Sequence, residues 1–68
     1  MSGVRGRRIA FDYGSVRIGV AICDPDGILA TPLPYIPNVP GRRARDISKL
    51  FDEYQPIAIY IGYPKHLS

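Results

Sequence analysis

The stretch from Arg8 to Gly27, RIAFDYGSVRIGVAICDPDG, decides the fold that we expect for this chain. It reads as two short apolar strands, Arg8–Asp12 and Arg17–Cys23, joined by a turn at Gly14. In the second strand large apolar residues alternate with small or polar ones, and the face with the small residues is predicted to pack closely against a bulky element such as a helix. The DPDG sequence that follows has the residue order of a tight turn, so the strand after it is predicted to be antiparallel.

Asp12 stands at the end of the first strand, although aspartate is a poor strand former. A carboxylate in this position is exposed yet held by a rigid scaffold, which suits the binding of a metal ion or a phosphate group. A purely structural alternative is an Asx-turn, in which the carboxylate caps the bend from Asp12 to Ser15. The residue pattern alone leaves both interpretations open.

The remaining segments complete an α/β pattern with one helix. A third strand begins at Ile28 and runs towards Leu33, at a sheet edge because its prolines cannot donate ladder hydrogen bonds. Tyr35–Gly41 is expected to be a loop, and apolar residues at helical spacing predict a helix from Arg42 to Tyr54. The unbroken apolar run Ile57–Ile61 predicts a strand that is buried on both faces and parallel to an earlier strand.

Composition favours a small cytoplasmic protein that has no membrane partner. No apolar run in the 68 residues approaches the roughly 20 needed to cross a membrane, and no secretory signal precedes the first strand. Cys23 is the only cysteine, which excludes an intrachain disulfide. The net charge of +3 includes arginines in residues 1–7, which are expected to form a flexible basic arm. Such clusters favour nucleic acid as a partner, although a solvated basic surface explains the charge equally well.

The segments IAFDYGSVRIGVAICDPDG, ATPLP, DEYQP and IYIGYP resemble the YqgF (RuvX) family. Members of that family are described as pre-16S ribosomal RNA nucleases or Holliday-junction-resolvase-like proteins. The resemblance covers nearly the whole chain after its first six residues. It implies an α/β, ribonuclease H-like fold, of which residues 1–68 are the N-terminal portion of a single domain. The expected order is β-β-β-α-β, with three antiparallel strands and one parallel strand.

The resemblance implies that Asp12 is a catalytic carboxylate and binds a divalent metal ion, Mg²⁺ or Mn²⁺. It also implies that Arg17, in the RIGVA string, contacts the backbone of structured RNA or branched DNA. The further nucleic-acid contacts that we predict are Arg8, Tyr13, Gly14 and Lys65. Nuclease chemistry of this class usually uses two ions held by several carboxylates. Because the later acidic residues of the family are not part of this sequence, we expect the chain to be weakly active or inactive.

Two other functions stay open at this stage. The D-Y-G turn after the first strand also resembles the phosphate-cradling turn of actin-like and sugar-kinase-type ATPases, which implies an ATP-binding lobe. The remaining interpretation is a non-catalytic module that binds nucleic acid and associates with itself. One helix cannot cover both faces of a four-stranded sheet, so an uncovered apolar face predicts a homodimer.

Overall fold

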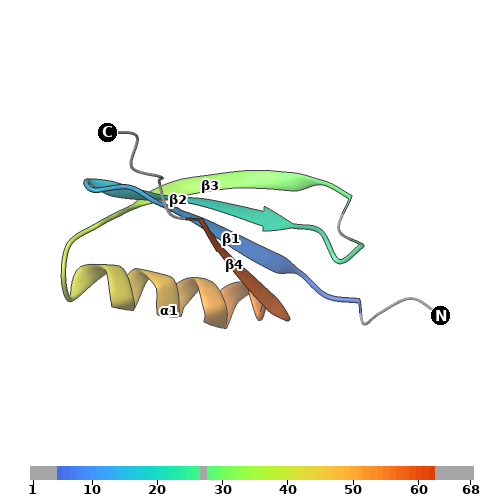
Figure 1. The fold of residues 1–68 in the computed structure, drawn as a ribbon. Coiled ribbons are helices and arrows are strands. Elements are labelled where there is room, and N and C mark those ends of the chain that lie inside the picture. Colours follow the sequence, from blue (N-terminus) through green and yellow to red (C-terminus); the bar gives the residue numbers. More distant parts are fainter. Residues whose placement is uncertain (1–4, 27, 63–68) are drawn as a thin grey trace, which may run out of the picture.

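The computed structural model describes residues 5–26 and 28–62, which form a four-stranded mixed sheet with one helix against one of its faces (Figure 1). The elements are β1 (Arg8–Tyr13), β2 (Arg17–Cys23), β3 (Ala30–Pro37), α1 (Arg42–Tyr54) and β4 (Ala58–Gly62). The strand order is β3-β2-β1-β4, in which β4 is parallel to β1 and the other neighbours are antiparallel. This confirms the predicted α/β arrangement of the N-terminal part of a ribonuclease H-like fold.

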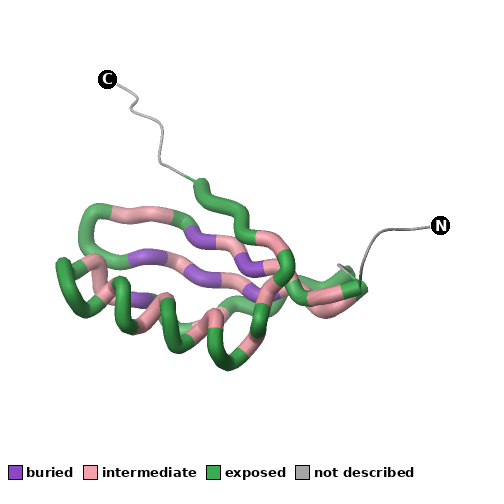
Figure 2. The backbone as a smooth tube through the Cα atoms, turned by 90° about the horizontal axis from the view of Figure 1, so that it is seen from below, coloured by how far each residue is buried: buried purple, intermediate pink, exposed green. Residues whose placement is uncertain are grey.

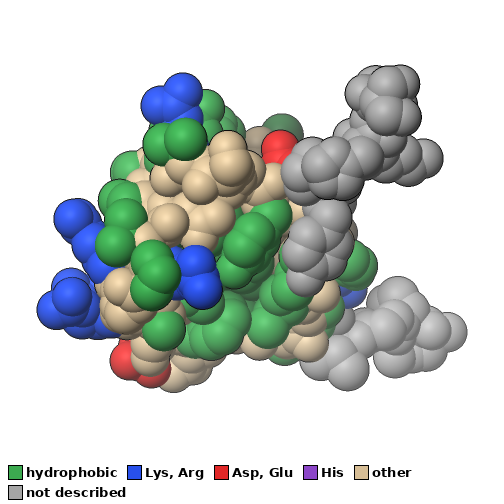
Figure 3. Space-filling view, turned by 60° about the vertical axis from the view of Figure 1, so that its left-hand side comes forward, with side chains coloured by type: hydrophobic (Ala, Val, Ile, Leu, Met, Phe, Trp, Pro, Cys, Tyr) green, Lys and Arg blue, Asp and Glu red, His purple; other side chains and the backbone are tan. Residues whose placement is uncertain are grey.

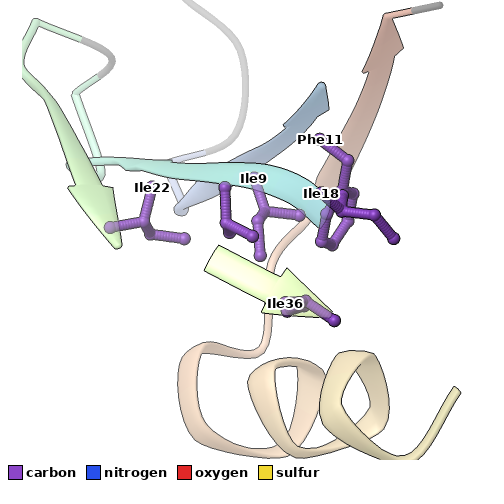
Figure 4. Close-up of a cluster of buried hydrophobic side chains, with 6 residues drawn as sticks. Ile9, Phe11, Ile18, Ile22 and Ile36 are labelled. Carbon is purple, nitrogen blue, oxygen red and sulfur yellow. The ribbon is translucent and has the colours of Figure 1, made fainter. Parts of the chain in front are cut away.

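The hydrophobic core lies between the sheet and α1 (Figure 2), and it uses the large apolar residues of β2, not the small ones that were predicted to meet a helix. Ile9 pairs with Ile22 and Phe11 pairs with Val20 across β1 and β2, so these side chains share one face of the sheet. Figure 4 shows core side chains pointing from the strands towards the helix. On the helix, the ring of Phe51 meets that of Phe11 edge-on, with 6.3 Å between the centroids. The buried core residues are Ile9, Phe11, Ile18, Val20, Ile22 and Ile36.

Both ends of α1 fall where the sequence predicts them. At the start, Gly41 has a φ of 83°, a left-handed conformation that glycine adopts without strain. At the end, Gln55 has a φ of 47° and donates its backbone N–H to the carbonyl of Phe51 at 2.8 Å. Pro56 follows and cannot continue the helix. Within the described residues, no helix is long and apolar enough to cross a membrane.

The third strand begins two residues later than predicted, at Ala30 rather than Ile28. The cause is Asp24, whose carboxylate accepts backbone N–H groups from Ile28 at 2.7 Å and from Leu29 at 3.1 Å. A side chain that binds backbone donors in this way competes with the sheet for them. Ile28 and Leu29 therefore belong to the connection between β2 and β3.

The same strand also continues to Pro37, so the first three residues of the predicted loop Tyr35–Gly41 belong to β3. Proline was the reason for predicting a loop there. An edge strand tolerates proline because the missing N–H would point away from the sheet. The edge position of this strand was predicted correctly, and that position is what allows it to be longer than expected.

β4 forms the opposite edge of the sheet and is largely exposed, contrary to the prediction of a strand buried on both faces. It covers Ala58–Gly62, one residue later than the predicted Ile57–Ile61, and the side chains of Ile59, Tyr60 and Ile61 are 47%, 56% and 52% exposed. Among the described elements, the backbone of α1 approaches β3 but not β4. An apolar run is buried only where another layer covers it, and no described element covers this one.

The three described residues before β1 contact the rest of the fold. Nε of Arg5 donates to the Asp26 carboxylate at 2.8 Å, and this hydrogen bond and the charge of Asp26 raise the pKa of the guanidinium. The carbonyl of Arg7 accepts the backbone N–H of Ile57 at 2.8 Å. The flexible arm expected for residues 1–7 stays a prediction, because its first four residues lie outside the described part of the chain.

Candidate functional site

Asp12 lies on the helix-free face of the sheet, opposite the core. It pairs with Gly19 of β2 and with Gly62 of β4, and residues that pair in register share a face. Its neighbour Phe11 points to the other side, into the core. The helix-free face contains an open hollow of about 710 Å³. Residues lining it include Ala10, Asp12, Ala21, Tyr35, Tyr60 and Gly62.

The Asp12 carboxylate is exposed, and it makes no hydrogen bond or ion pair with any other described residue. Glycines flank it on both sides. A Cβ atom added to Gly19 would lie 3.5 Å from Cβ of Asp12, and one added to Gly62 would lie 3.9 Å from its Oδ1. The Asx-turn considered for Asp12 is not seen in the structure. The carboxylate is therefore held in position by β1 and is free to bind a ligand.

The turn after Asp12 is built from backbone contacts. The N–H of Gly14 donates to the carbonyl of Arg17 at 3.1 Å. A Cβ atom at Gly14 would lie 2.6 Å from that carbonyl oxygen, which is too close for any side chain. Glycine is needed here for steric reasons, since its φ is not among the positive values of the described residues.

Asn38, which no sequence pattern identifies as part of the site, holds this turn in place. Its Nδ2 donates to the carbonyl of Gly14 at 2.7 Å, and its backbone N–H donates to the carbonyl of Val16 at 2.9 Å. Its Oδ1 in turn accepts from Nη1 of Arg43 at 2.7 Å. A single asparagine in a predicted loop carries no pattern that could have revealed this contact.

A bulge in β3 decides the position of Tyr35, which was predicted to lie in a loop. Ile18 pairs with Ile36 and Val20 pairs with Leu33, so β3 has one more residue than β2 between these pairs. The extra residue reverses the alternation of the strand. Ile36 therefore reaches the core, and Tyr35 lies on the helix-free face with its side chain 63% exposed.

Arg17 lies beside Asp12 on this face and stacks on Tyr35. Because Asp12 pairs with Gly19, Arg17 is its diagonal neighbour across the strand pair. The guanidinium carbon of Arg17 lies 4.7 Å from the centroid of the Tyr35 ring. Asp12, Arg17, Gly19 and Tyr35 line a second hollow of about 310 Å³ together with the β1–β2 turn.

The other predicted contacts lie at different distances from Asp12. Gly14 and Tyr13 line the smaller hollow with it. Tyr13 pairs with Ile18, and its side chain packs against the core on the helix side. Arg8 is at the far end of β1, roughly 13 Å away along the strand, and Nη1 donates to the carbonyl of Gly6 at 3.5 Å. Lys65 lies outside the described residues.

The end of the molecule that carries the β1–β2 turn and the start of α1 is rich in positive charge (Figure 3). Lys and Arg side chains stand at the left margin of this view, at its top and near its centre, between hydrophobic side chains, and Asp and Glu side chains show only at its lower left and near its top. Arg17, Arg42, Arg43 and Arg45 belong to these two segments. An anionic ligand would therefore meet positive charge at the end of the sheet where Asp12 lies.

The described residues offer one carboxylate for a metal ion at this position. No group of three or more His, Cys, Asp and Glu side chains comes together in residues 5–26 and 28–62. Mg²⁺ is commonly held by one or two carboxylates, with water and substrate phosphates completing an octahedron of oxygen atoms. The uncapped carboxylate of Asp12 fits one ligand position of such an ion, and it does not suffice for two ions.

Known proteins match this chain over most of its length. A family model described as "RuvX: Holliday junction resolvase" matches residues 6–68. Relatives with the name "Putative pre-16S rRNA nuclease" are 52% identical over 65 residues in Streptomyces avermitilis and 50% over 68 residues in Rhodococcus erythropolis. The one in Mycolicibacterium smegmatis is 45% identical over 67 residues.

Each of these alignments covers 93% of this chain but only 41%, 38% and 39% of the respective relative, so the chain spans about two fifths of their length. The family match includes every strand and the helix of the described structure. The motif residues around Asp12 and the mixed sheet agree with that match. The chain therefore belongs to the RuvX family, whose model is described as a Holliday junction resolvase.

Proposed function

We propose that this chain is the N-terminal part of a nuclease that hydrolyses phosphodiester bonds in structured nucleic acid. Asp12 is its catalytic, metal-binding carboxylate. The observation that supports the proposal is an exposed Asp12 carboxylate, without a partner among the described residues, beside the arginine of the RIGVA string. The names of the relatives favour pre-16S ribosomal RNA as the substrate. Processing at the 5′ end of that RNA is part of our proposal.

Each residue of the site has a distinct task in this proposal. A divalent ion, Mg²⁺ or Mn²⁺, supplies positive charge for the scissile phosphate and lowers the pKa of a bound water. Asp12 provides one oxygen ligand for that ion from a rigid strand. Arg17 binds a phosphate through the planar edge of its guanidinium, which can donate two parallel hydrogen bonds. Arg8, Tyr13, Gly14 and Lys65 are proposed as further contacts to the nucleic acid.

The expected setting follows from this substrate. Ribosomal RNA is processed where ribosomes are assembled, so we propose that the protein is cytoplasmic. Its partner is RNA or branched DNA, and the positive end of the sheet is the surface that meets it. The affinity is therefore expected to fall as salt is added, because bound cations are released from the nucleic acid.

Cleavage assays on the chain test the proposal. Structured RNA with a pre-16S 5′ leader and a four-way DNA junction are incubated with Mg²⁺, with Mn²⁺ or with a chelator. We expect weak, metal-dependent cleavage or none, and we expect Mn²⁺ to bind through Asp12. Mn²⁺ binding is read from the relaxation of water protons. Asp12→Asn is expected to abolish the Mn²⁺ binding and any cleavage. Asp52→Asn, a control on the exposed side of α1, is expected to change neither.

Three outcomes would count against this proposal. Robust metal-dependent cleavage that survives Asp12→Asn would show that another group holds the ion. Robust cleavage that Asp12→Asn abolishes would keep Asp12 but overturn the expected weak activity. Submicromolar affinity for ATP would favour the ATP-binding lobe over the nuclease.

A further inference from the structure

Two opposite charges on the helix-free face are close neighbours but do not pair. Asp12 and Arg17 are diagonal neighbours across β1 and β2, roughly 7–8 Å apart at their backbones, which is within reach of a long side chain. Within the described residues, neither group makes an ion pair. The guanidinium lies instead over the ring of Tyr35, at 4.7 Å from its centroid.

We propose that Tyr35 is a positioning residue that holds Arg17 away from Asp12. The carboxylate then stays free for a cation, and the guanidinium edge stays free for a phosphate. This inference rests on the proposed function, because it concerns the availability of the two groups that the nuclease would use. Without the ring, Arg17 and Asp12 would form an ion pair, and the site would lose part of its affinity for the cation and for the phosphate.

The two positions of the Arg17 side chain, stacked on Tyr35 or paired with Asp12, differ little in free energy. A guanidinium stacked on an exposed aromatic ring and an exposed ion pair have similar, modest strengths. Removing one of them therefore makes the other the preferred contact. Because Arg17 is exposed, its long side chain can change partner without disturbing the core.

The surroundings of Tyr35 favour this role over a structural one. Its ring is 63% exposed, so it contributes little to the core. Gly19 lies between Tyr35 and Asp12: a Cβ atom there would be 3.9 Å from Cε1 of the tyrosine and 3.5 Å from Cβ of the aspartate. No side chain therefore separates the ring from the carboxylate. The bulge in β3 is what places the ring there, since an unbroken alternation would point Tyr35 towards the helix.

The arrangement of Asp12 and Arg17 also indicates which kind of ligand fits the site. A cation site at Asp12 and an anion site at Arg17 share one hollow of about 310 Å³. A phosphodiester with an associated divalent ion presents both charges. By keeping Asp12 and Arg17 apart, Tyr35 thus leaves the site able to bind a phosphate together with its metal ion.

A double-mutant cycle tests the positioning role without metal or activity. The free energy of unfolding is measured for the chain, for Asp12→Asn, for Arg17→Gln and for the double variant. The cycle is then repeated in chains that also carry Tyr35→Leu or Tyr35→Phe. We expect no coupling between Asp12 and Arg17 in the natural chain or with Tyr35→Phe. With Tyr35→Leu we expect a coupling of roughly two- to five-fold in the unfolding constant at low salt.

Manganese binding supplies the second measurement. Tyr35→Leu is expected to weaken Mn²⁺ binding roughly two- to five-fold, and adding Arg17→Gln restores the affinity because the competing charge is gone. Tyr35→Phe keeps a ring of the same shape and leaves the affinity unchanged.

The possible failures of the two proposals can be told apart. Coupling already present in the natural chain, or absent with Tyr35→Leu, overturns the positioning role whatever the metal does. If Mn²⁺ binding does not depend on Asp12, the proposed function fails, while the cycle still decides the role of Tyr35. Full Mn²⁺ affinity with Tyr35→Leu also overturns the inference.

Discussion

The side-chain amide of Asn38 donates a hydrogen bond to the backbone carbonyl of Gly14, with 2.7 Å between nitrogen and oxygen. This contact joins the β1–β2 turn, which follows Asp12, to the segment that leads into α1. Gly14 and Asn38 are 24 residues apart in the sequence. The turn beside the candidate site is thus tied down by an amide that belongs to neither strand of the hairpin.

Asn38→Ala is expected to lower the free energy of unfolding by about 1–2 kcal/mol, because it removes the hydrogen bonds to Gly14 and from Arg43. Urea unfolding followed by circular dichroism measures the loss. Arg43→Met is the matched control, since it removes only one of the two bonds. A loss with Asn38→Ala that is no larger than with Arg43→Met would contradict the importance of the turn contact.

Gly14→Ala and Gly19→Ala should behave differently, although both glycines flank the site. A Cβ at Gly14 meets the carbonyl oxygen of Arg17 at 2.6 Å, so the turn must shift, at a cost of about 1–3 kcal/mol. At Gly19 the nearest atom is 3.5 Å away, an ordinary contact, and we expect a change within about 0.5 kcal/mol. Thermal unfolding of both variants checks this, and equal losses would disprove the steric account of the turn.

Ile9→Val tests the core between sheet and helix. Ile9 has no exposed surface, and removing one methyl group there is expected to cost about 0.5–1.5 kcal/mol. Ile28→Val removes the same group from a side chain that is 79% exposed and should change stability by less than about 0.5 kcal/mol. Chemical denaturation compares the two variants. Similar values would mean that the buried cluster is not the core of the fold.

Arg17→Gln is expected to weaken the binding of structured RNA and to reduce its salt dependence. Loss of one phosphate contact lowers the slope of log affinity against log salt by about 0.7–0.9. Fluorescence anisotropy at several salt concentrations measures it. Lys49→Gln, which removes an exposed charge from the middle of α1, away from the positive end, is the control and should leave the slope nearly unchanged. An equal effect of both variants would mean that only total charge matters.

We also propose that the chain forms a homodimer through the uncovered face of its sheet. Tyr60 is 56% exposed on that face and lies beside the hollow. The solution mass is expected to rise with concentration, and Tyr60→Lys should reduce this rise because it places a charge in the contact. Ile28→Lys, a change on the β2–β3 connection, should not. A constant monomer mass at two concentrations would rule the dimer out.

Local patterns in the sequence determined a large part of the fold. The period of the apolar residues placed α1 at Arg42–Tyr54, and the alternation in Arg17–Cys23 showed that β2 has two different faces, although the helix packs on the opposite face from the one predicted. The position of Asp12 near the end of β1 also came from residues next to it in the chain. These features depend on contacts a few residues apart, which a local pattern records.

The tertiary structure alone decided the rest of the site. Tyr35 faces Asp12 only because β3 pairs with β2 through a bulge, and Asn38 reaches Gly14 only because the chain returns to the hairpin. The burial of β4 was predicted wrongly for a related reason: an apolar run shows that a strand can be covered, not which element covers it. Strand register and layer order depend on partners far along the chain, and the energy of those contacts is not contained in any local pattern.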